Sequence, residues 1–134
     1  MATQYSLTQR TAQMSSLNTG IGINAVIKIF SGTVPANCGT ADTGTLLVTF
    51  AGNATAFGTV TGQVLTASAV ANATGAATGT AGYYRIYPAA ATTTNAITQG
   101  TCGTTGTDMI LTNTSIATGQ TCVFSSLTVT AFGV

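Results

Sequence analysis

Ala25-Val-Ile-Lys-Ile-Phe30 is the stretch of this sequence that decides the fold. Its β-branched and aromatic residues favour an extended strand, and the Ser31-Gly32 pair that follows ends it. From this stretch to the end of the chain, short apolar runs alternate with clusters of Gly, Pro, Asn and Thr. This alternation predicts an all-β domain rather than a helical one.

Further strands are expected wherever such an apolar run recurs. They cover residues 45–50, 57–60, 63–67, 83–87, 96–102, 108–112 and 121–132. The second and third of these runs form a hairpin through Thr61-Gly62, while residues 71–82 contain only small residues and predict a surface loop or an edge strand. So many short strands in 134 residues predict an antiparallel two-sheet sandwich, of which the jelly roll is one form.

One helix is expected, before the first strand. Ser6 and Gln9 have the spacing of a capping box, and Gly20 is expected to stop the helix. Four apolar residues share one face at helical spacing: Leu7, Met14, Leu17 and Ile21. This face packs either on the sheet or, as an arm, on a neighbouring subunit. We therefore expect one domain over residues 1–134, with a helix or arm over 1–23 and the sandwich over 24–134.

Two groups of residues are candidates for binding a partner protein. The first lies on the expected arm and comprises Tyr5, Leu7, Met14 and Leu17. The second is one face of the strand at 83–87, where period-2 alternation places Tyr83, Arg85 and Tyr87 together. A guanidinium between two phenol rings can stack on either, and such a face can hold a partner or a sugar. Its alternative is a solvent-facing ladder that shields a sheet edge.

The composition argues against catalysis. Charged residues make up 4% of the chain, and His and Glu are absent, so proton-transfer groups are scarce. Asp42 and Asp108 lie far apart in sequence, and Lys28 is expected to face solvent from the first strand. We therefore expect no enzyme, with no catalytic residues, cofactor, metal site or small-molecule substrate.

The same composition limits the partners. A net charge of +1 gives no basic surface for nucleic acid. No apolar run approaches the roughly 20 residues that span a bilayer, and the N-terminus does not read as a signal peptide, so no membrane association is expected. Near-neutral charge instead favours self-association.

The three cysteines, Cys38, Cys102 and Cys122, lack the spacing of a zinc site. We expect small, half-buried thiols, with a disulfide between Cys102 and Cys122 as the alternative. Asp108 is expected to accept backbone hydrogen bonds in the glycine-rich turn at 103–106.

Three stretches of the chain together resemble a family of small proteins encoded with the head genes of tailed bacteriophages. They are Ala25-Val-Ile-Lys-Ile-Phe-Ser-Gly-Thr-Val-Pro-Ala36, Gly82-Tyr-Tyr-Arg-Ile-Tyr87 and residues 100–116, and the likeness extends over nearly the whole chain. The resemblance implies a capsid decoration or cement protein with a jelly-roll-like fold. It further implies a homodimer or homotrimer that is made in the bacterial cytoplasm and clamps the major capsid protein on the outer surface of the virion.

Two other functions stay open at this point. One is a tail or fibre module that binds a host surface glycan through Tyr83, Arg85 and Tyr87. The other is a structural subunit that polymerises with itself.

Overall fold

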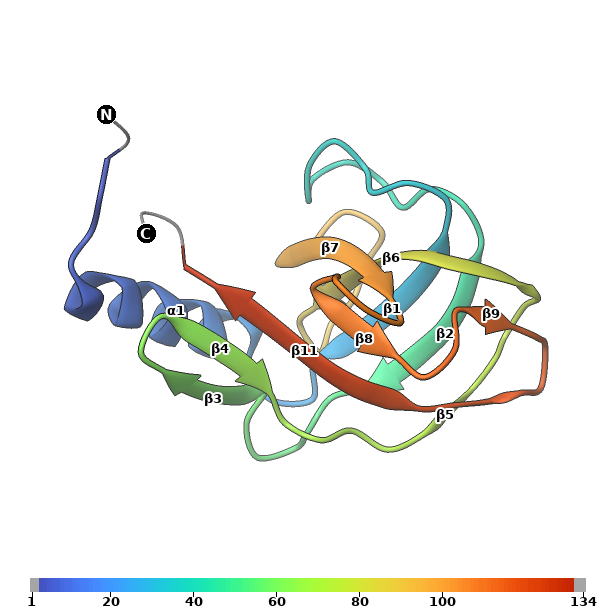
Figure 1. Cartoon of the computed structure of the whole chain (residues 1–134). Helices are drawn as coiled ribbons and strands as arrows, with labels where there is room; N and C mark the ends of the chain where they lie inside the picture. Colours follow the sequence, from blue (N-terminus) through green and yellow to red (C-terminus); the bar gives the residue numbers. More distant parts are fainter. Residues whose placement is uncertain (1–2, 132–134) are drawn as a thin grey trace.

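Helix α1 (Leu7–Ile21) opens the described part of the chain in the computed structural model, which describes residues 3–131 (Figure 1). The hydroxyl of Ser6 accepts the backbone N–H of Gln9 at 3.2 Å, which confirms Ser6 as the N-cap. The helix ends at Gly22 rather than at Gly20. Gly22 has φ of 74°, and its N–H donates to the carbonyl of Asn18 at 3.1 Å.

Eleven strands follow in the described residues. They are β1 (Val26–Ser31), β2 (Leu46–Ala51), β3 (Gly58–Thr61), β4 (Val64–Ala67), β5 (Ala73–Thr74), β6 (Gly79–Tyr87), β7 (Thr98–Gly103), β8 (Met109–Leu111), β9 (Ser115–Ile116), β10 (Thr121–Cys122) and β11 (Phe124–Thr130). The expected strands are thus present. Residues 71–82 also hold β5 and the start of β6, and the expected closing strand is interrupted at Val123. Its last expected residue, Phe132, lies outside the described residues, as do residues 1–2 of the expected arm.

Nine strands form one sheet with the order β2-β1-β6-β7-β8-β11-β4-β3, and β9 pairs with β6 beside this path. A separate two-stranded sheet joins β10 to β5. All pairs are antiparallel except β7 and β8, which run parallel, so the large sheet is mixed rather than purely antiparallel. The parallel pairing covers only Cys102↔Met109 and Gly103↔Ile110. Strand β8 thus begins beside the end of β7. Residues 104–108 are enough to connect the two strands, and the parallel pairing needs no long crossover.

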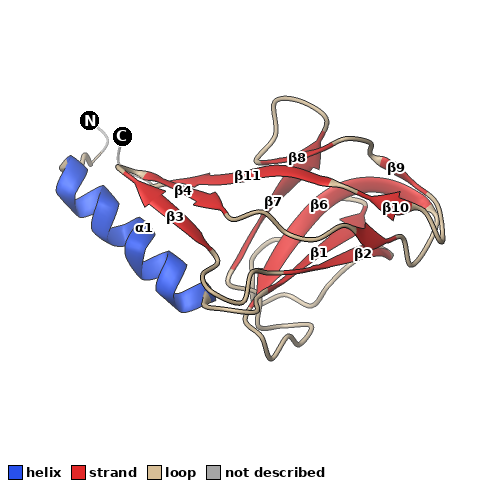
Figure 2. Cartoon of the chain, turned by 90° about the horizontal axis from the view of Figure 1, so that it is seen from below, coloured by secondary structure: helices blue, strands red, loops and turns tan. Residues whose placement is uncertain are grey.

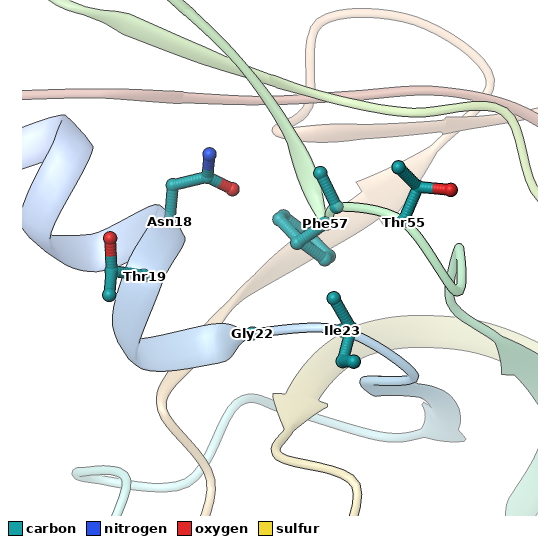
Figure 3. A pocket seen from close by; sticks show the side chains of 7 residues that line it. Asn18, Thr19, Gly22, Ile23, Thr55 and Phe57 are labelled. Atoms are coloured by element: carbon teal, nitrogen blue, oxygen red, sulfur yellow. The ribbon is translucent and has the colours of Figure 1, made fainter.

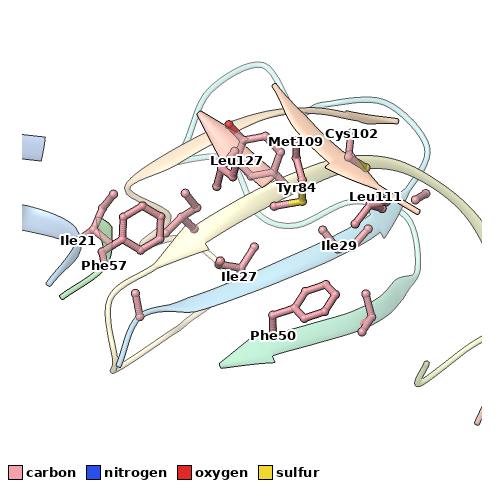
Figure 4. Packing of buried hydrophobic residues seen from close by; sticks show 14 of the residues in the cluster. Ile21, Ile27, Ile29, Phe50, Phe57, Tyr84, Cys102, Met109, Leu111 and Leu127 are labelled. Atoms are coloured by element: carbon pink, nitrogen blue, oxygen red, sulfur yellow. The ribbon is translucent and has the colours of Figure 1, made fainter. Parts of the chain in front are cut away.

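The large sheet is curled, and its inner face holds the core (Figure 4). Ile27 and Ile29 of β1 and Tyr84 of β6 are buried there. Four strands separate β2 from β11 in the sheet order, yet the ring centroids of Phe50 in β2 and Phe124 in β11 are 5.9 Å apart. This edge-to-face contact across the interior requires the sheet to fold over on itself.

Helix α1 lies beside the β3–β4 hairpin at one end of the molecule, away from β1, β2 and β6 (Figure 2). Met14 and Ile21 are the buried residues of the helix. The side-chain amide of Asn18 donates to the Gly58 carbonyl at 3.0 Å and accepts the Gly58 N–H at 3.1 Å. Asn18 thereby satisfies backbone groups at the start of the edge strand β3 and fixes the helix against it.

Candidate partner-binding surfaces

Arg85 of β6 lies on the outer face of the curled sheet, but it is fully buried, with 0% of its surface exposed. Most of its partners belong to the loop between β1 and β2, residues 32–45, and Thr93 and Gln99 also contact it. Asp42 of this loop forms an ion pair with Arg85, with 2.8 Å between Nη1 and the carboxylate Oδ1. Arg85 is therefore the centre of a buried polar cluster and not part of an exposed platform.

The guanidinium of Arg85 donates hydrogen bonds in several directions. Nη1 donates to the Thr40 carbonyl at 2.7 Å and Nη2 to the Asn37 carbonyl at 3.0 Å. Nε and Nη2 both donate to the Gln99 side-chain oxygen, at 3.0 and 2.9 Å, and the Gln99 amide donates to the Pro35 carbonyl at 2.7 Å. These bonds satisfy a buried charge and attach the 32–45 loop to β6 and β7.

The two tyrosines beside Arg85 also hold this loop. The Tyr87 hydroxyl donates to the Asp42 carboxylate, and the Tyr83 hydroxyl donates to the Thr43 carbonyl and accepts the Thr43 N–H at 3.0 Å. Burial, followed by the hydrogen bond with Asp42, raises the pKa of Tyr87 above its ordinary value. Burial alone would lower the pKa of Arg85, but hydrogen bonds with Tyr87 and Asp42 outweigh it and raise that pKa. Arg85 is therefore charged and Tyr87 neutral at neutral pH.

The expectation that Tyr83, Arg85 and Tyr87 face solvent is wrong, because the 32–45 loop covers all three. The expected stacking is different as well. Lys28 lies over the Tyr87 ring, with Nζ 4.7 Å from the centroid, and Phe30 stacks on Tyr83 at 5.0 Å. Lys28 is accordingly half-buried rather than solvent-facing. In the isolated chain this face is not available to a partner or a sugar.

The N-terminal candidates divide into two pairs. Met14 is buried and Leu17 is half-buried against the core, whereas Tyr5 is 43% and Leu7 is 56% exposed. The sheet therefore covers the face of the helix at Met14, whereas the first turn is covered only in part, where Leu7 lies beside Gly62. Tyr5 and Leu7 stay available for a partner.

A hollow of about 300 Å³ lies where the C-terminal end of α1 meets the segment before β3 (Figure 3). It is lined by Asn18, Thr19, Gly22, Ile23, Thr55, Ala56 and Phe57. Ile23 is 53% exposed at its edge, and the Asn18 amide is already occupied by Gly58. The hollow offers apolar contact rather than directed hydrogen bonds, so it suits a protruding side chain of a partner better than a small polar ligand.

The three cysteines are free thiols. Cys38 is half-buried, as expected, whereas Cys102 and Cys122 are buried more deeply than expected, and the alternative disulfide does not form. Burial raises the pKa of Cys102 from 9.0 to about 11 and raises that of Cys122 as well, which keeps both thiols protonated at neutral pH.

The two carboxylates do not form a catalytic pair. Asp42 is bound to Arg85 on the outer side of β6, whereas Asp108 accepts the Thr101 N–H at 3.3 Å on the other side. Asp108 was expected to accept hydrogen bonds from the backbone of the turn at 103–106. Its donor, Thr101, instead lies in β7, before that turn. In residues 3–131, no three His, Cys, Asp or Glu side chains lie together as metal ligands, and no helix is long and apolar enough to cross a bilayer.

Sequence reasoning missed the partners of Arg85. Asp42 and Gln99 are 43 and 14 residues away from it, and no local pattern links them. One signal was available: a chain with so few charges places an Arg in the middle of an apolar strand, where it requires a buried acceptor. The exposed Ile23 was also missed, because it follows the expected helix stop.

No family model, curated protein or solved structure matches this chain. The likeness to phage head proteins thus stays a prediction from the sequence.

Proposed function

We propose that this chain is a structural virion protein, a capsid decoration or cement protein that binds the major capsid protein of a tailed phage. The sequence stretches at 25–36, 82–87 and 100–116 suggest the family. The jelly-roll-like sandwich and the location on the outer surface of the virion belong to this proposal and stay predictions.

The observation that carries the proposal is the distribution of exposed apolar side chains. Five large apolar side chains are exposed in residues 3–131, and Tyr5, Leu7 and Ile23 of these lie in or next to α1. Since α1 stands at one end of the molecule (Figure 1), this end offers apolar anchors, and Arg10 is the one charged residue of the helix. Protein interfaces gain most of their binding energy from such anchors, with polar contacts around them.

The neutral surface fits the same role. A decoration protein is bound in many copies on one shell, and a net charge of +1 per copy produces little repulsion between neighbours. We therefore propose that the α1 end contacts the major capsid protein and that copies associate as homodimers or homotrimers.

The test uses heads of the phage that encodes the chain, stripped of the decoration protein and then incubated with purified variants. Tyr5→Ser and Leu7→Ser together should weaken binding by about 30-fold or more, since each anchor of this kind contributes about 1–2 kcal/mol. Deleting residues 1–18 is a blunter change, because it also removes the buried Met14 and the Asn18 contact.

Val123→Ser is the matched control, because Val123 is also an exposed apolar residue but lies between β10 and β11. Strand β10 stands at the end of the molecule opposite α1 (Figure 2). The occupancy of this control on heads should equal that of the unaltered chain. Full occupancy of the Tyr5→Ser/Leu7→Ser variant would refute the α1 interface.

Self-polymerisation stays the competing structural role, since a neutral surface favours association of any kind. Electron microscopy of the purified chain distinguishes the two, because only a polymer forms long ordered assemblies without a capsid. The tail-module alternative loses its expected binding platform, since Tyr83, Arg85 and Tyr87 are buried.

A further inference from the structure

Strand β8 is too short to fill the space between β7 and β11. It pairs with Cys102 and Gly103 at the end of β7 and with the first half of β11. The start of β7 and the end of β11 are left without a strand between them. A cavity of about 320 Å³ lies there, lined by Tyr84, Thr98, Gln99, Thr107, Asp108, Thr128, Val129 and Thr130.

Tyr84 lines this cavity from the neighbouring strand β6. Its ring extends from β6 toward Met109 and Leu127 (Figure 4), and only 2% of its surface is exposed. Its hydroxyl forms no hydrogen bond with any residue in the 3–131 range. The hydroxyl oxygen itself is not fully buried, because it opens into the cavity. A ligand in the cavity can therefore accept the hydrogen bond that this hydroxyl is free to donate.

Gly100 brings the Tyr84 hydroxyl and the Asp108 carboxylate into one corner of the cavity. A Cβ atom at Gly100 would lie 2.9 Å from the hydroxyl and 2.6 Å from the carboxylate Oδ2, so only glycine leaves room for both. Burial, followed by the charge of Asp108, raises the pKa of Tyr84, which keeps the hydroxyl a donor. The corner thus presents one donor beside one charged acceptor.

The remaining walls are rich in hydroxyl groups. Asp108 is exposed and uses Oδ2 for the Thr101 N–H, which leaves Oδ1 available. Thr128 and Thr130 are exposed at one wall and Thr98 is half-exposed at the other. No Lys or Arg lines the cavity.

We propose that this cavity binds one neutral sugar residue of a glycan. An anion is disfavoured because the only charge in the lining is the Asp108 carboxylate, and a metal ion would lack further carboxylate ligands. An ammonium group alone would leave most of a 320 Å³ cavity empty, whereas small-molecule sites begin at about 300 Å³. A ring that carries several hydroxyls matches both the size and the mixture of donors and acceptors.

In this site Tyr84 donates to a sugar oxygen, Asp108 accepts from one or two sugar hydroxyls, and the threonines exchange hydrogen bonds around the ring. The inference does not depend on the capsid role. A protein on the outside of a virion can carry a glycan site, and so can a tail module.

The experiment titrates the full ¹⁵N-labelled chain with glucose, galactose, mannose and N-acetylglucosamine and follows the amide resonances. At least one sugar should shift resonances of residues 98–101 and 107–108 with a saturable curve. Tyr84→Phe and Asp108→Asn should each weaken this binding about tenfold, as expected for the loss of one hydrogen bond. Tyr5→Phe, the same change at an exposed tyrosine outside the cavity, should leave it unchanged.

Three outcomes would overturn the proposal. The first is the absence of saturable shifts at the cavity with all four sugars. The second is binding that Tyr84→Phe and Asp108→Asn leave unchanged while both variants retain the native spectrum. The third is saturation by butylamine, titrated in parallel, without any response to the sugars, which would assign the cavity to a cationic side chain of a partner protein.

Discussion

Replacing Asp42 by Ala tests whether the buried ion pair holds the 32–45 loop on the sheet. The change leaves Arg85, which is 0% exposed, without the one carboxylate that pairs with it in residues 3–131, and it removes the acceptor of the Tyr87 hydroxyl. Breaking one side of a buried pair costs about 3–5 kcal/mol, a large part of the total stability of a domain. For 134 residues the entropy of unfolding is roughly 0.28 kcal/mol per kelvin. The melting temperature should therefore fall by roughly 11–18 °C.

Thermal unfolding followed by circular dichroism measures this shift, with urea unfolding as an independent estimate of the free energy. Asp108→Ala is the matched control, because this exposed carboxylate accepts one 3.3 Å hydrogen bond and should lose less than about 1 kcal/mol. The double variant Asp42→Ala/Arg85→Met removes both charges and should recover much of the loss. A fall of less than about 3 °C for Asp42→Ala would refute the reasoning, as would a double variant less stable than Asp42→Ala alone.

Three further predictions concern the thiols and the glycines. In the native chain a thiol reagent should modify Cys38 rapidly and the two buried thiols slowly, and three free thiols should be found after denaturation; a single free thiol there would indicate a disulfide. The free energy of unfolding should fall as pH rises from 9 to 11, because the folded state keeps the Cys102 proton that the unfolded state loses; a Cys102→Ala variant with the same slope would contradict this. Gly82→Ala should destabilise the chain by about 3 kcal/mol or more, because the added Cβ would overlap the Gly32 carbonyl. Gly20→Ala should instead stabilise helix α1 by about 0.5–1 kcal/mol, because its Cβ meets no atom within 4 Å. Equal melting temperatures for the two variants would refute these opposite effects.

Local signals account for what could be predicted from the sequence. The Ser6 cap and the apolar spacing of Met14 and Ile21 predicted the helix, and period-2 runs predicted most of the strands. The hairpin at Thr61-Gly62 also formed, since Gly62 adopts the positive φ of 59° that a tight turn requires. Each of these features depends on residues close together in the chain.

Long-range contacts account for what could not be predicted. The burial of Arg85 depends on Asp42, which arrives from a loop between two other strands, so alternation within β6 could not reveal which of its faces is covered. The parallel pairing of β7 and β8 depends on a two-pair register that no local pattern encodes. The Tyr84 cavity was missed for the same reason, because it exists only where β8 ends between two distant strands.

The candidate interface was predicted in part. The apolar face of the N-terminal helix was predicted from the sequence, but the sequence does not indicate which of its residues pack against the sheet. Met14 packs against the core while Leu7 stays 56% exposed, because the β3–β4 hairpin reaches Leu7 only with its turn at Gly62. Docking on the sheet and contact with a partner are thus compatible along one helix.

A reconstruction of the phage particle by electron cryomicroscopy tests the capsid role most directly. Copies of this chain should occupy symmetry-related positions on the outer surface of the head, with Tyr5, Leu7 and Ile23 buried against the major capsid protein. Copies found only at the tail, or a head-bound chain with its α1 end facing solvent, would contradict this role.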